Sequence, residues 1–408
     1  MLTWRRPVSF VNARIATGTG IVSSLRIGSR ILAIDERPRA GDLVVDLNGA
    51  CVLPGLINAH DHLELNHYGP LKRRDCYQNA SAWIDDLRPE LQRDGAIRKN
   101  SAYPLAARLF IGGLKNVLAG ATTVAHHNPF YRELGRWFPV RVVNRYGWAH
   151  SFLLERQPVG AHGEPGGDVR ERCLATPAGV PFIVHASEGT DDEAAGELRR
   201  LDTLGCLRSN TVVVHGVAWT PGDWARVVAR GASLIWCPAS NLFLFGRTTP
   251  VPEFLDSDTA AGSRICLGSD SRVTGARDLI DELRVAAAAT PTDSNALLRM
   301  VTTAPAGILK LRDSGRIVVG GPADLLVVPP NDKGPAEALL ATSRRDVLLV
   351  TIAGRPVVGS PALRPVFGAR RTAMRSIAVD GVERLAESRL ARAIARCPIA
   401  EPGVECLS

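Results

Sequence analysis

Apolar and polar residues alternate in blocks through the middle of the chain. Between about residues 100 and 290, stretches with helical periodicity alternate with short apolar runs bounded by glycine, proline or polar residues. The helical stretches are residues 105–119, 193–204 and 221–230, and the predicted strands are residues 122–125, 140–149, 181–185, 211–215, 233–237 and 264–267. This alternation predicts a parallel α/β fold. Polar residues at many of the strand ends favour a closed (β/α)8 TIM-like barrel over an open sheet.

The two ends of the chain have a different pattern, with short strand-like segments separated by glycine and proline. In the second half these predicted strands are residues 315–319, 324–328, 347–352 and 357–358. The simplest assembly is a discontinuous β-sandwich domain of residues 1–52 and 314–366 beside a hydrolase barrel of residues 53–313. Residues 367–408 form an arginine-rich C-terminal tail that is partly helical, with a helix predicted near residues 379–395.

Composition excludes several classes of protein. Of 408 residues, 45% are hydrophobic and 22% are charged, which suits a folded chain with a large core. The apolar runs are far shorter than the ~20 residues that cross a bilayer. We therefore expect no membrane partner. The first residues lack a secretory signal, and the eight cysteines form no C-x-x-C pair, which predicts reduced thiols in a cytoplasmic protein.

The net charge of +8 raises the question of a nucleic-acid partner. All but five of the 49 basic residues are arginines, and they are spread along the chain without aromatic interleaving. A coding bias for arginine explains this distribution better than a binding surface does. We expect a small-molecule substrate and no nucleic acid, and the sequence leaves a homodimer open.

Ionisable residues follow the predicted strands in a pattern that suggests a metal site. His60 and His62 end the first buried strand, His185 and His215 end two later strands, and Asp270 follows another. Residues two apart on a strand face the same way, and barrel strands converge at their C-terminal ends. Four imidazoles and one carboxylate suit Zn²⁺, Fe²⁺ or Mn²⁺, with an open position for a water molecule.

The motifs around these residues resemble a known family. The stretch VLPGLINAHDHLE is similar to the first-strand signature of the amidohydrolase superfamily. HASEG, VHGV, CPASNLFLF and LGSDS follow in the order of its cytosine deaminase, guanine deaminase and triazine chlorohydrolase branch. TTAPAGILKLRDSGRIVVGGPADLLVV resembles that branch's return into its β-sandwich. The likeness covers about residues 1–360 and implies a (β/α)8 barrel with a flanking composite β-sandwich domain.

The resemblance also implies roles for the residues at the strand ends. The expected metal ligands are His60, His62, His185, Asp270 and His215. His215 would be a further ligand or would orient the bound water, Asp270 would be the general base, and Glu188 would shuttle protons. Binuclear relatives bridge their ions with a carboxylated lysine at a strand end, and none of the lysines here (72, 99, 115, 310 and 333) is so placed. We therefore expect one divalent ion, with zinc ahead of iron and manganese.

Candidate substrate-binding residues lie beyond the first motif and near other strand ends. Chlorohydrolase relatives place substrate contacts at the positions of Glu64 and Asn66. The other candidates are His127, Trp148, Trp236 and Arg272. Trp236 departs from the deaminase pattern, which has a histidine directly before the C-P-x-S-N run. The departure matters because an indole can donate only one hydrogen bond.

This departure favours hydrolysis of an amide or amidine C–N bond in a small cyclic nitrogen-containing substrate by a metal-activated hydroxide. The first alternative is hydrolytic deamination of a purine, pyrimidine, pterin or triazine-like ring. A catalytically silent barrel scaffold is a further alternative. The retained ligand set argues against it.

Overall fold

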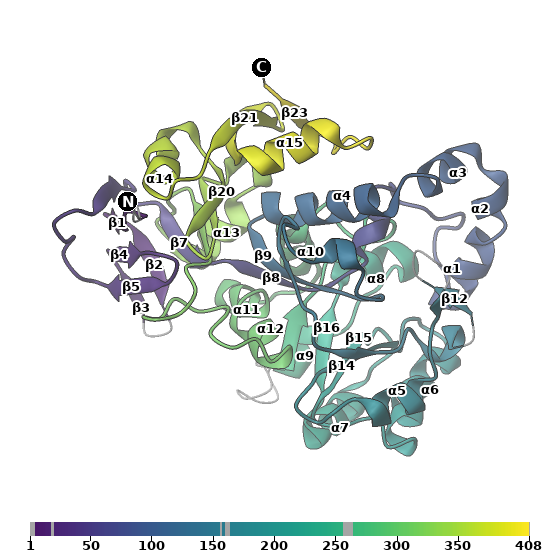
Figure 1. Ribbon diagram of the computed structural model, residues 1–408. Coiled ribbons are helices and arrows are strands. Elements are labelled where there is room, and N and C mark those ends of the chain that lie inside the picture. Colours follow the sequence, from purple (N-terminus) through teal and green to yellow (C-terminus); the bar gives the residue numbers. More distant parts are fainter. Residues whose placement is uncertain (1–4, 18–19, 156, 160–163, 256–263, 408) are drawn as a thin grey trace.

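The computed structural model describes residues 5–17, 20–155, 157–159, 164–255 and 264–407 (Figure 1). Its architecture is mixed α/β. The purple N-terminal strands and the yellow-green C-terminal strands lie together on one side of the molecule, and the blue to teal central residues form the larger part. The segments farthest apart in the sequence are thus neighbours in space.

The larger part is built on two groups of parallel strands. The first sheet has the order β10 (Arg141–Val142), β9 (Ala121–His126), β8 (Leu56–Asp61). The second has the order β11 (Gly147–Trp148), β14 (Phe182–Ala186), β15 (Thr211–His215), β16 (Ser233–Trp236), β17 (Ile265–Leu267). Beyond the end of β17, the Asp270 amide donates to the His60 carbonyl at 3.1 Å, which joins the two groups at one seam.

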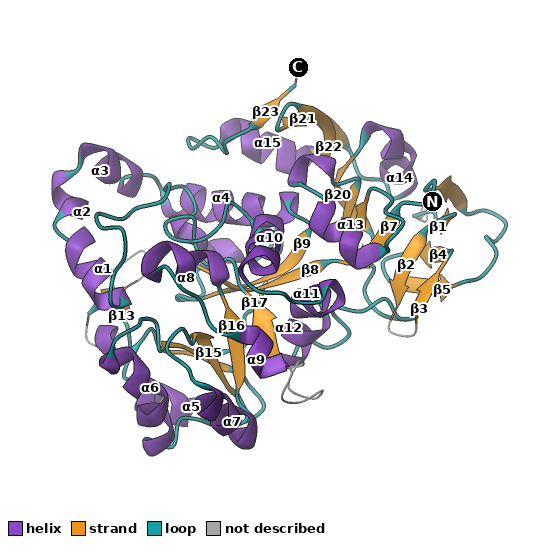
Figure 2. Cartoon of the chain, turned by 180° about the vertical axis from the view of Figure 1, so that it is seen from behind, coloured by secondary structure: helices purple, strands orange, loops and turns teal. Residues whose placement is uncertain are grey.

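Helices alternate with these strands and surround them (Figure 2). The helices of the described chain are α1 (Ala80–Leu87), α2 (Glu90–Arg93), α3 (Gly95–Ser101), α4 (Leu105–Leu118), α5 (Val169–Ala175), α6 (Asp192–Thr203), α7 (Pro221–Arg230), α8 (Pro238–Phe245), α9 (Val251–Leu255), α10 (Leu279–Ala289), α11 (Ser294–Met300), α12 (Thr303–Ile308), α13 (Pro335–Ala341), α14 (Arg364–Ala369) and α15 (Ser388–Arg396). Of these, α14 and α15 pack against the strands from the ends of the chain instead. Side chains on one face of the parallel strands pack against the helices, and those on the other face pack mainly against one another, so every residue of β8, β9 and β14 to β17 is buried. Within the described residues, every helix is too short or too polar to cross a membrane.

The remaining described strands form three sheets, and the largest of them combines strands from both ends of the chain. A nine-stranded sheet has the order β23 (Val404–Cys406), β21 (Met374–Val379), β22 (Val382–Glu387), β20 (Arg355–Gly359), β19 (Leu349–Ile352), β18 (Leu325–Val328), β7 (Cys51–Pro54), β2 (Arg14–Thr17), β3 (Gly20–Val22). A four-stranded sheet has the order β5 (Ile31–Ile34), β4 (Leu25–Ile27), β1 (Val8–Val11), β6 (Leu43–Asp46), and β12 (Pro158–Val159) pairs with β13 (Glu164–Pro165). The domain boundaries expected from the sequence stay a prediction.

The structure corrects three of the predicted elements. Residues 140–149 are not one strand: β10 and β11 belong to different sheets. Residues 315–319 form no strand. The helix expected near residues 379–395 begins only at Ser388, because Asp380 and Gly381 close a hairpin between β21 and β22. Both have positive φ (47° and 79°), as a two-residue Asp-Gly hairpin turn requires.

Helix α4 packs unusually close to the chain that follows β8. A short 3₁₀ helix, η1 (Leu63–Leu65), lies against α4. A Cβ atom added at Gly112 of α4 would stand 2.4 Å from the Leu63 carbonyl oxygen. Only glycine lets the helix approach at this distance, and the approach brings the next turn of α4 beneath the end of β8.

We expect Gly112→Ala to destabilise the protein by about 1–3 kcal/mol, because the added methyl group must push α4 away from η1. Gly307→Ala is the matched control, since Gly307 also lies in a helix and its added Cβ meets no atom within 4 Å. The control should leave stability unchanged or raise it slightly. Urea unfolding followed by circular dichroism measures both, and equal stability of the two variants would contradict the close packing.

Candidate metal centre and active site

Four strands deliver the expected metal ligands to one end of the parallel sheets. His60 lies in β8 and His62 directly after it, His185 lies in β14, His215 ends β15, and Asp270 follows β17. The parallel register of β14 and β15 sets His215 opposite Ala186, one residue beyond His185. All five side chains are buried, with relative exposures between 0% and 7%. The structure therefore brings together the whole ligand set that the sequence predicted.

The donor atoms of these residues lie at distances that suit a shared cation. The Nε2 atoms of His60 and His185 are 3.3 Å apart. Asp270 Oδ1 is 3.8 Å from Nε2 of both His60 and His62. Donor atoms of His60, His185 and His215 lie within 4.8 Å of one another, and so do those of His60, His62 and Asp270. The two groups share His60, so they describe one continuous site.

Hydrogen bonds on the far side of the rings aim the Nε2 atoms into the site. His185 Nδ1 is 2.9 Å from the His150 carbonyl oxygen, and His215 Nδ1 is 2.9 Å from Asn241 Oδ1. With Nδ1 as the donor, Nε2 carries a free lone pair, as in metal-binding histidines. Burial and the neighbouring imidazoles lower the pKa of His60 and His185 well below 6.5. These rings are therefore neutral, which is the form that binds metal.

The carboxylate of Asp270 accepts hydrogen bonds from several neighbouring donors. Its Oδ1 accepts from the Ser271 amide at 2.7 Å, and its Oδ2 accepts from the hydroxyls of Ser240 at 2.9 Å and Thr274 at 3.1 Å. Burial alone would raise the pKa of Asp270, but the nearby histidines and these hydrogen bonds lower it overall. The side chain is an ionised carboxylate that can bind a cation or accept a proton.

The backbone at the site is strained at three residues with left-handed φ. These are Ser187 (φ = 56°), His215 (φ = 77°) and Asp270 (φ = 49°), and each follows or ends a parallel strand. Such conformations persist only where the surrounding structure fixes them, and they gather at functional sites. Gly268 allows β17 to approach β8 closely, since a Cβ there would lie 2.5 Å from His60 Cβ. A side chain at that position would separate β17 from β8.

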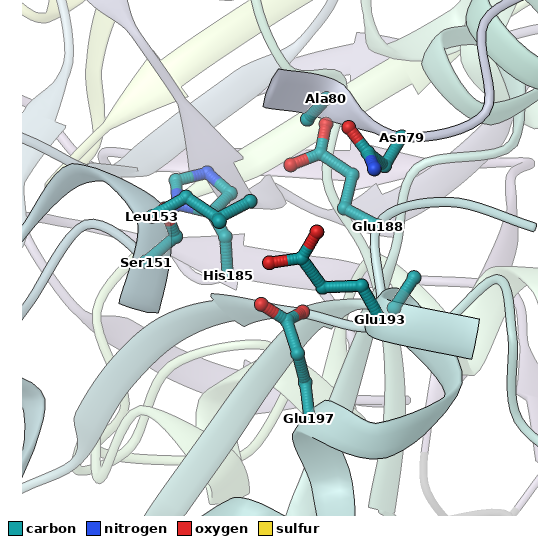
Figure 3. Close-up of a pocket in the computed structure, with 9 residues that line it drawn as sticks. Asn79, Ala80, Ser151, Leu153, His185, Glu188, Glu193 and Glu197 are labelled. Carbon is teal, nitrogen blue, oxygen red and sulfur yellow. The ribbon is translucent and has the colours of Figure 1, made fainter. Parts of the chain in front are cut away.

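Glu188 lies beside the ligands, as expected for a proton shuttle. Its Oε1 is 3.4 Å from His215 Nε2, and burial raises its pKa to about 7. Its carbonyl accepts from the Ala80 amide at 3.0 Å, which ties the loop to α1. Figure 3 shows the carboxyl group of Glu188 next to Asn79, with His185 across the same pocket. A carboxyl group with a pKa near 7 can both give and take a proton at neutral pH.

A cavity of about 210 Å³ opens onto the metal-ligand candidates. Its polar wall includes His62, His185, His215, Asp270 and Glu188, together with Glu64, Asn128 and His150. Its apolar wall consists of Leu65, Ala80, Trp83, Ile84, Leu154 and Leu244. A polar floor and an apolar wall suit a flat ring whose reacting carbon faces the ligands.

Of the predicted substrate-binding residues, Glu64 lines this cavity. Its Oε1 accepts from Asn128 Nδ2 at 2.6 Å, whereas its Oε2 and Asn128 Oδ1 have no hydrogen-bond partner among the described residues. Burial raises the pKa of Glu64. Asn128 was not predicted, and its place two residues beyond the end of β9 is the only signal that could have found it.

Two of the predicted substrate contacts are engaged elsewhere. The guanidinium group of Arg272 forms a two-pronged pair with Glu401 at 2.7 and 2.8 Å, so it has no free edge for a substrate carboxylate. Trp236 is fully buried and donates from Nε1 to Thr248 Oγ1 at 2.7 Å. Neither residue lines the cavity beside the ligands.

The other three candidates are also outside the cavity. Asn66 is buried, and its amide donates to Asp61 Oδ1 at 2.7 Å. His127 Nε2 is 3.0 Å from the Ala149 carbonyl oxygen, and the Trp148 ring packs at its edge with a centroid distance of 5.9 Å. These side chains lie behind the cavity wall, and their part in substrate binding stays a prediction. A position near a strand end does not show whether a side chain lines the cavity or packs behind its wall.

Comparison with known proteins agrees with this geometry. The sequence profile of the Amidohydrolase family matches residues 173–357. A 5-methylthioadenosine/S-adenosylhomocysteine deaminase of Halobacterium salinarum is 29% identical over 356 residues, which cover 74% of this chain and 78% of that protein. A 5'-deoxyadenosine deaminase of Methanobrevibacter smithii is 24% identical, with 74% and 78% covered.

Solved structures share the fold. A triazine hydrolase from Arthrobacter aurescens superposes with a TM-score of 0.68 at 19% identity, covering 90% of this chain and 99% of that one. An adenosine deaminase from Xanthomonas campestris with bound zinc has a TM-score of 0.66 at 18% identity, covering 90% and 96%. The family profile and the curated deaminases confirm the resemblance to the amidohydrolase superfamily and its deaminases, and the solved structures show a shared fold.

We expect His62→Ala and Asp270→Asn to lose at least about nine-tenths of the zinc that the unaltered protein binds, because each removes a donor from a buried site. His67→Ala is the control, since His67 bonds to the Asn100 carbonyl and lies outside both donor groups. Elemental analysis after dialysis against zinc gives the stoichiometry, and circular dichroism checks the fold. Full zinc content in folded His62→Ala would contradict the assigned site.

Proposed function

We propose that this protein is a zinc-dependent hydrolase that removes an exocyclic amino group from a small nitrogen-containing ring. The main support for this proposal is that five side chains converge at one end of a cavity that Glu188 also lines. They are His60, His62, His185, His215 and Asp270. The reaction adds water across a C–NH₂ carbon and releases ammonia, leaving a ring carbonyl. We take the two parallel sheets as the wall of a (β/α)8 barrel and the remaining sheets as its composite β-sandwich.

The comparisons and the cavity together favour deamination over ring opening. The curated relatives are named as deaminases of adenosine-type nucleosides, and their matches span about three quarters of this chain. The sequence-based preference for amide hydrolysis rested on the absence of a histidine at position 236. Trp236, which stands there, packs in the core and donates to Thr248, so it does not take the histidine's place at the cavity. Ring opening of a cyclic amide remains the second candidate.

The donor set fits zinc. Neutral imidazoles and a carboxylate are its usual oxygen and nitrogen ligands, and solved relatives hold it. Zinc, when bound, lowers the pKa of water toward ~7 and so makes hydroxide available at neutral pH. A single ion is proposed, because Lys115 lies in α4 and its amino group is engaged with Asp61, so it cannot serve as a carboxylated bridge.

The other steps of the reaction, which are proton transfer, substrate binding and orientation of the water, are assigned to side chains of the cavity. Asp270 accepts a proton from the attacking water, since its carboxylate is ionised. Glu188 gives a proton to the ring nitrogen or to the departing amine. Glu64 Oε2, 3.7 Å from His126 Nδ1, and Asn128 Oδ1 are buried oxygen atoms without hydrogen-bond partners among the described residues, which suits N–H groups on the ring edge. His215 lies between Glu188 and the other ligands and orients the water.

We also propose a cytoplasmic enzyme with a small-molecule substrate. The eight free cysteines support this location. A homodimer stays a prediction.

Turnover should fall on the alkaline side as Glu188 loses its proton. Its pKa is raised to about 7, so the protonated form dominates below pH 7 and disappears as the pH rises through that value. Glu188→Gln should lower kcat about 10²–10⁴-fold and abolish this limb of the pH profile. Glu171→Gln, on the exposed surface of α5, should keep both. An unchanged alkaline limb in Glu188→Gln would remove Glu188 from the mechanism.

The reaction itself is tested by ammonia release from a panel of ring substrates. The panel contains 5'-deoxyadenosine, adenosine, guanine, cytosine and amino-triazines, with hydantoin and dihydrouracil as cyclic amides. Ammonia release with a product one mass unit heavier supports deamination. Gain of water without ammonia supports ring opening and overturns the proposal. A zinc-free protein that turns over nothing, even after zinc is added, would indicate a silent scaffold.

A further inference from the structure

A lysine side chain is completely buried behind the metal-ligand candidates. Lys115 lies in α4 with 0% exposure, among the largest fully buried side chains of the chain. Lysine is seldom fully buried unless its charge is paired. The neighbouring residues Leu114, Val117 and Leu118 are apolar core residues, and Lys115 and Asn116 are the buried polar pair among them.

The contacts of Lys115 match an ammonium group with all three protons used. Nζ lies 3.2 Å from Asp61 Oδ2, and it donates to Asn66 Oδ1 at 2.7 Å and to the backbone carbonyl of Asp270 at 3.0 Å. An ammonium group has three donors and no acceptor, so each donor has one partner. The third contact reaches the metal-ligand candidate Asp270 directly.

Asp61 stands between two metal-ligand candidates in the sequence but faces the other way. Residues alternate in direction along a strand, so His60 and His62 point to the metal site and Asp61 points toward α4. Its carboxylate accepts from the amides of Asn66 at 2.7 Å and Asn116 at 2.8 Å as well as from Lys115. The end of β8 is therefore clamped on both faces.

Asp270 needs such a clamp more than the other ligand candidates do. Its backbone is left-handed, with φ = 49°, and it lies in the loop beyond the end of β17. Side-chain donors to its carbonyl oxygen are Lys115 and the Ser269 hydroxyl, the latter at 3.2 Å. Its amide reaches the His60 carbonyl at 3.1 Å. Lys115 thus connects the loop of Asp270 to the strand of His60 and His62.

We propose that Lys115 is a positioning residue whose buried ammonium group, paired with Asp61, fixes Asp270 against the end of β8 in the conformation that binds metal. Gly112, one turn earlier in α4, permits the close approach of the helix that this contact requires. The inference rests on the proposed function in one respect, namely that Asp270 is a metal ligand. A purely structural ion pair would stabilise the fold without setting zinc affinity.

A double-mutant cycle separates the two roles. Lys115→Met leaves the Asp61 carboxylate buried without its cation, and Asp61→Asn leaves the Lys115 tether to Asp270 in place. The double variant Asp61→Asn/Lys115→Met removes both charges together, so the fold is spared an unpaired buried ion. Lys99→Met, on the exposed surface of α3, is the control. Zinc affinity is measured by competition with a chelator, and melting temperature and kcat are measured alongside.

The double variant is expected to melt close to the unaltered protein yet bind zinc at least about tenfold more weakly, as for residues that orient metal ligands. Its kcat should fall at least about tenfold with little change in KM. Asp61→Asn should weaken zinc binding by a smaller factor than the double variant, because Lys115 keeps its contact with the Asp270 carbonyl. Native zinc affinity and kcat in the double variant would overturn the proposal and leave a structural pair. The zinc measurement needs no substrate, so a failure to find turnover tests the proposed function separately.

Discussion

Burial of charge is the constraint on which the rest of this structure depends. An ionised carboxylate in a protein interior needs a cation or several hydrogen bonds close by. Two such carboxylates lie within the parallel strands, Asp61 on one side of β8 and Asp270 beyond β17. Lys115 compensates the first. A divalent ion held by the surrounding imidazoles would compensate the second, which gives a physical reason for four buried histidines at one site.

Strand β8 contributes to both the metal site and the Lys115–Asp61 pair, because its side chains alternate between its two faces. His60 and His62 lie on the face toward the cavity, and Asp61 lies on the face toward α4. The glycines at Gly112 and Gly268 bring the partners close, the first from α4 and the second from the end of β17. Geometry at the metal site is thus set by packing on the far side of the sheet as much as by the ligands themselves.

Much of this could be predicted from the sequence, because buried parallel strands leave a strong signal. The apolar runs ending in His185 and His215 match β14 and β15, and the five metal-ligand candidates do converge. Alternation cannot show where a strand breaks, so residues 140–149 were predicted as one strand although they form β10 and β11. The Asp-Gly pair at residues 380–381 indicates a hairpin turn, but the helical pattern of the residues after it led to a helix prediction that included the pair.

Residues behind the ligands were harder to assign, because their roles depend on contacts distant in sequence. Arg272 follows Asp270 closely, yet its partner Glu401 lies near the end of the chain. Trp236 occupies a motif position but packs in the core. Lys115 had one local signal, a lysine followed by an asparagine within a largely apolar helical stretch. Its partner Asp61 lies between two histidines whose pattern indicates metal binding and gives no sign of an ion pair with a helix.

The most direct test of the central claim is X-ray absorption at the zinc edge on the zinc-loaded protein. We expect nitrogen and oxygen neighbours at about 2.0–2.2 Å, with the scattering pattern of several imidazoles and no sulfur. A sulfur neighbour at about 2.3 Å would mean that a cysteine holds the ion. A shell of oxygen atoms without imidazole would mean that zinc lies elsewhere. Either result would contradict a centre built from the histidines of β8, β14 and β15 with Asp270.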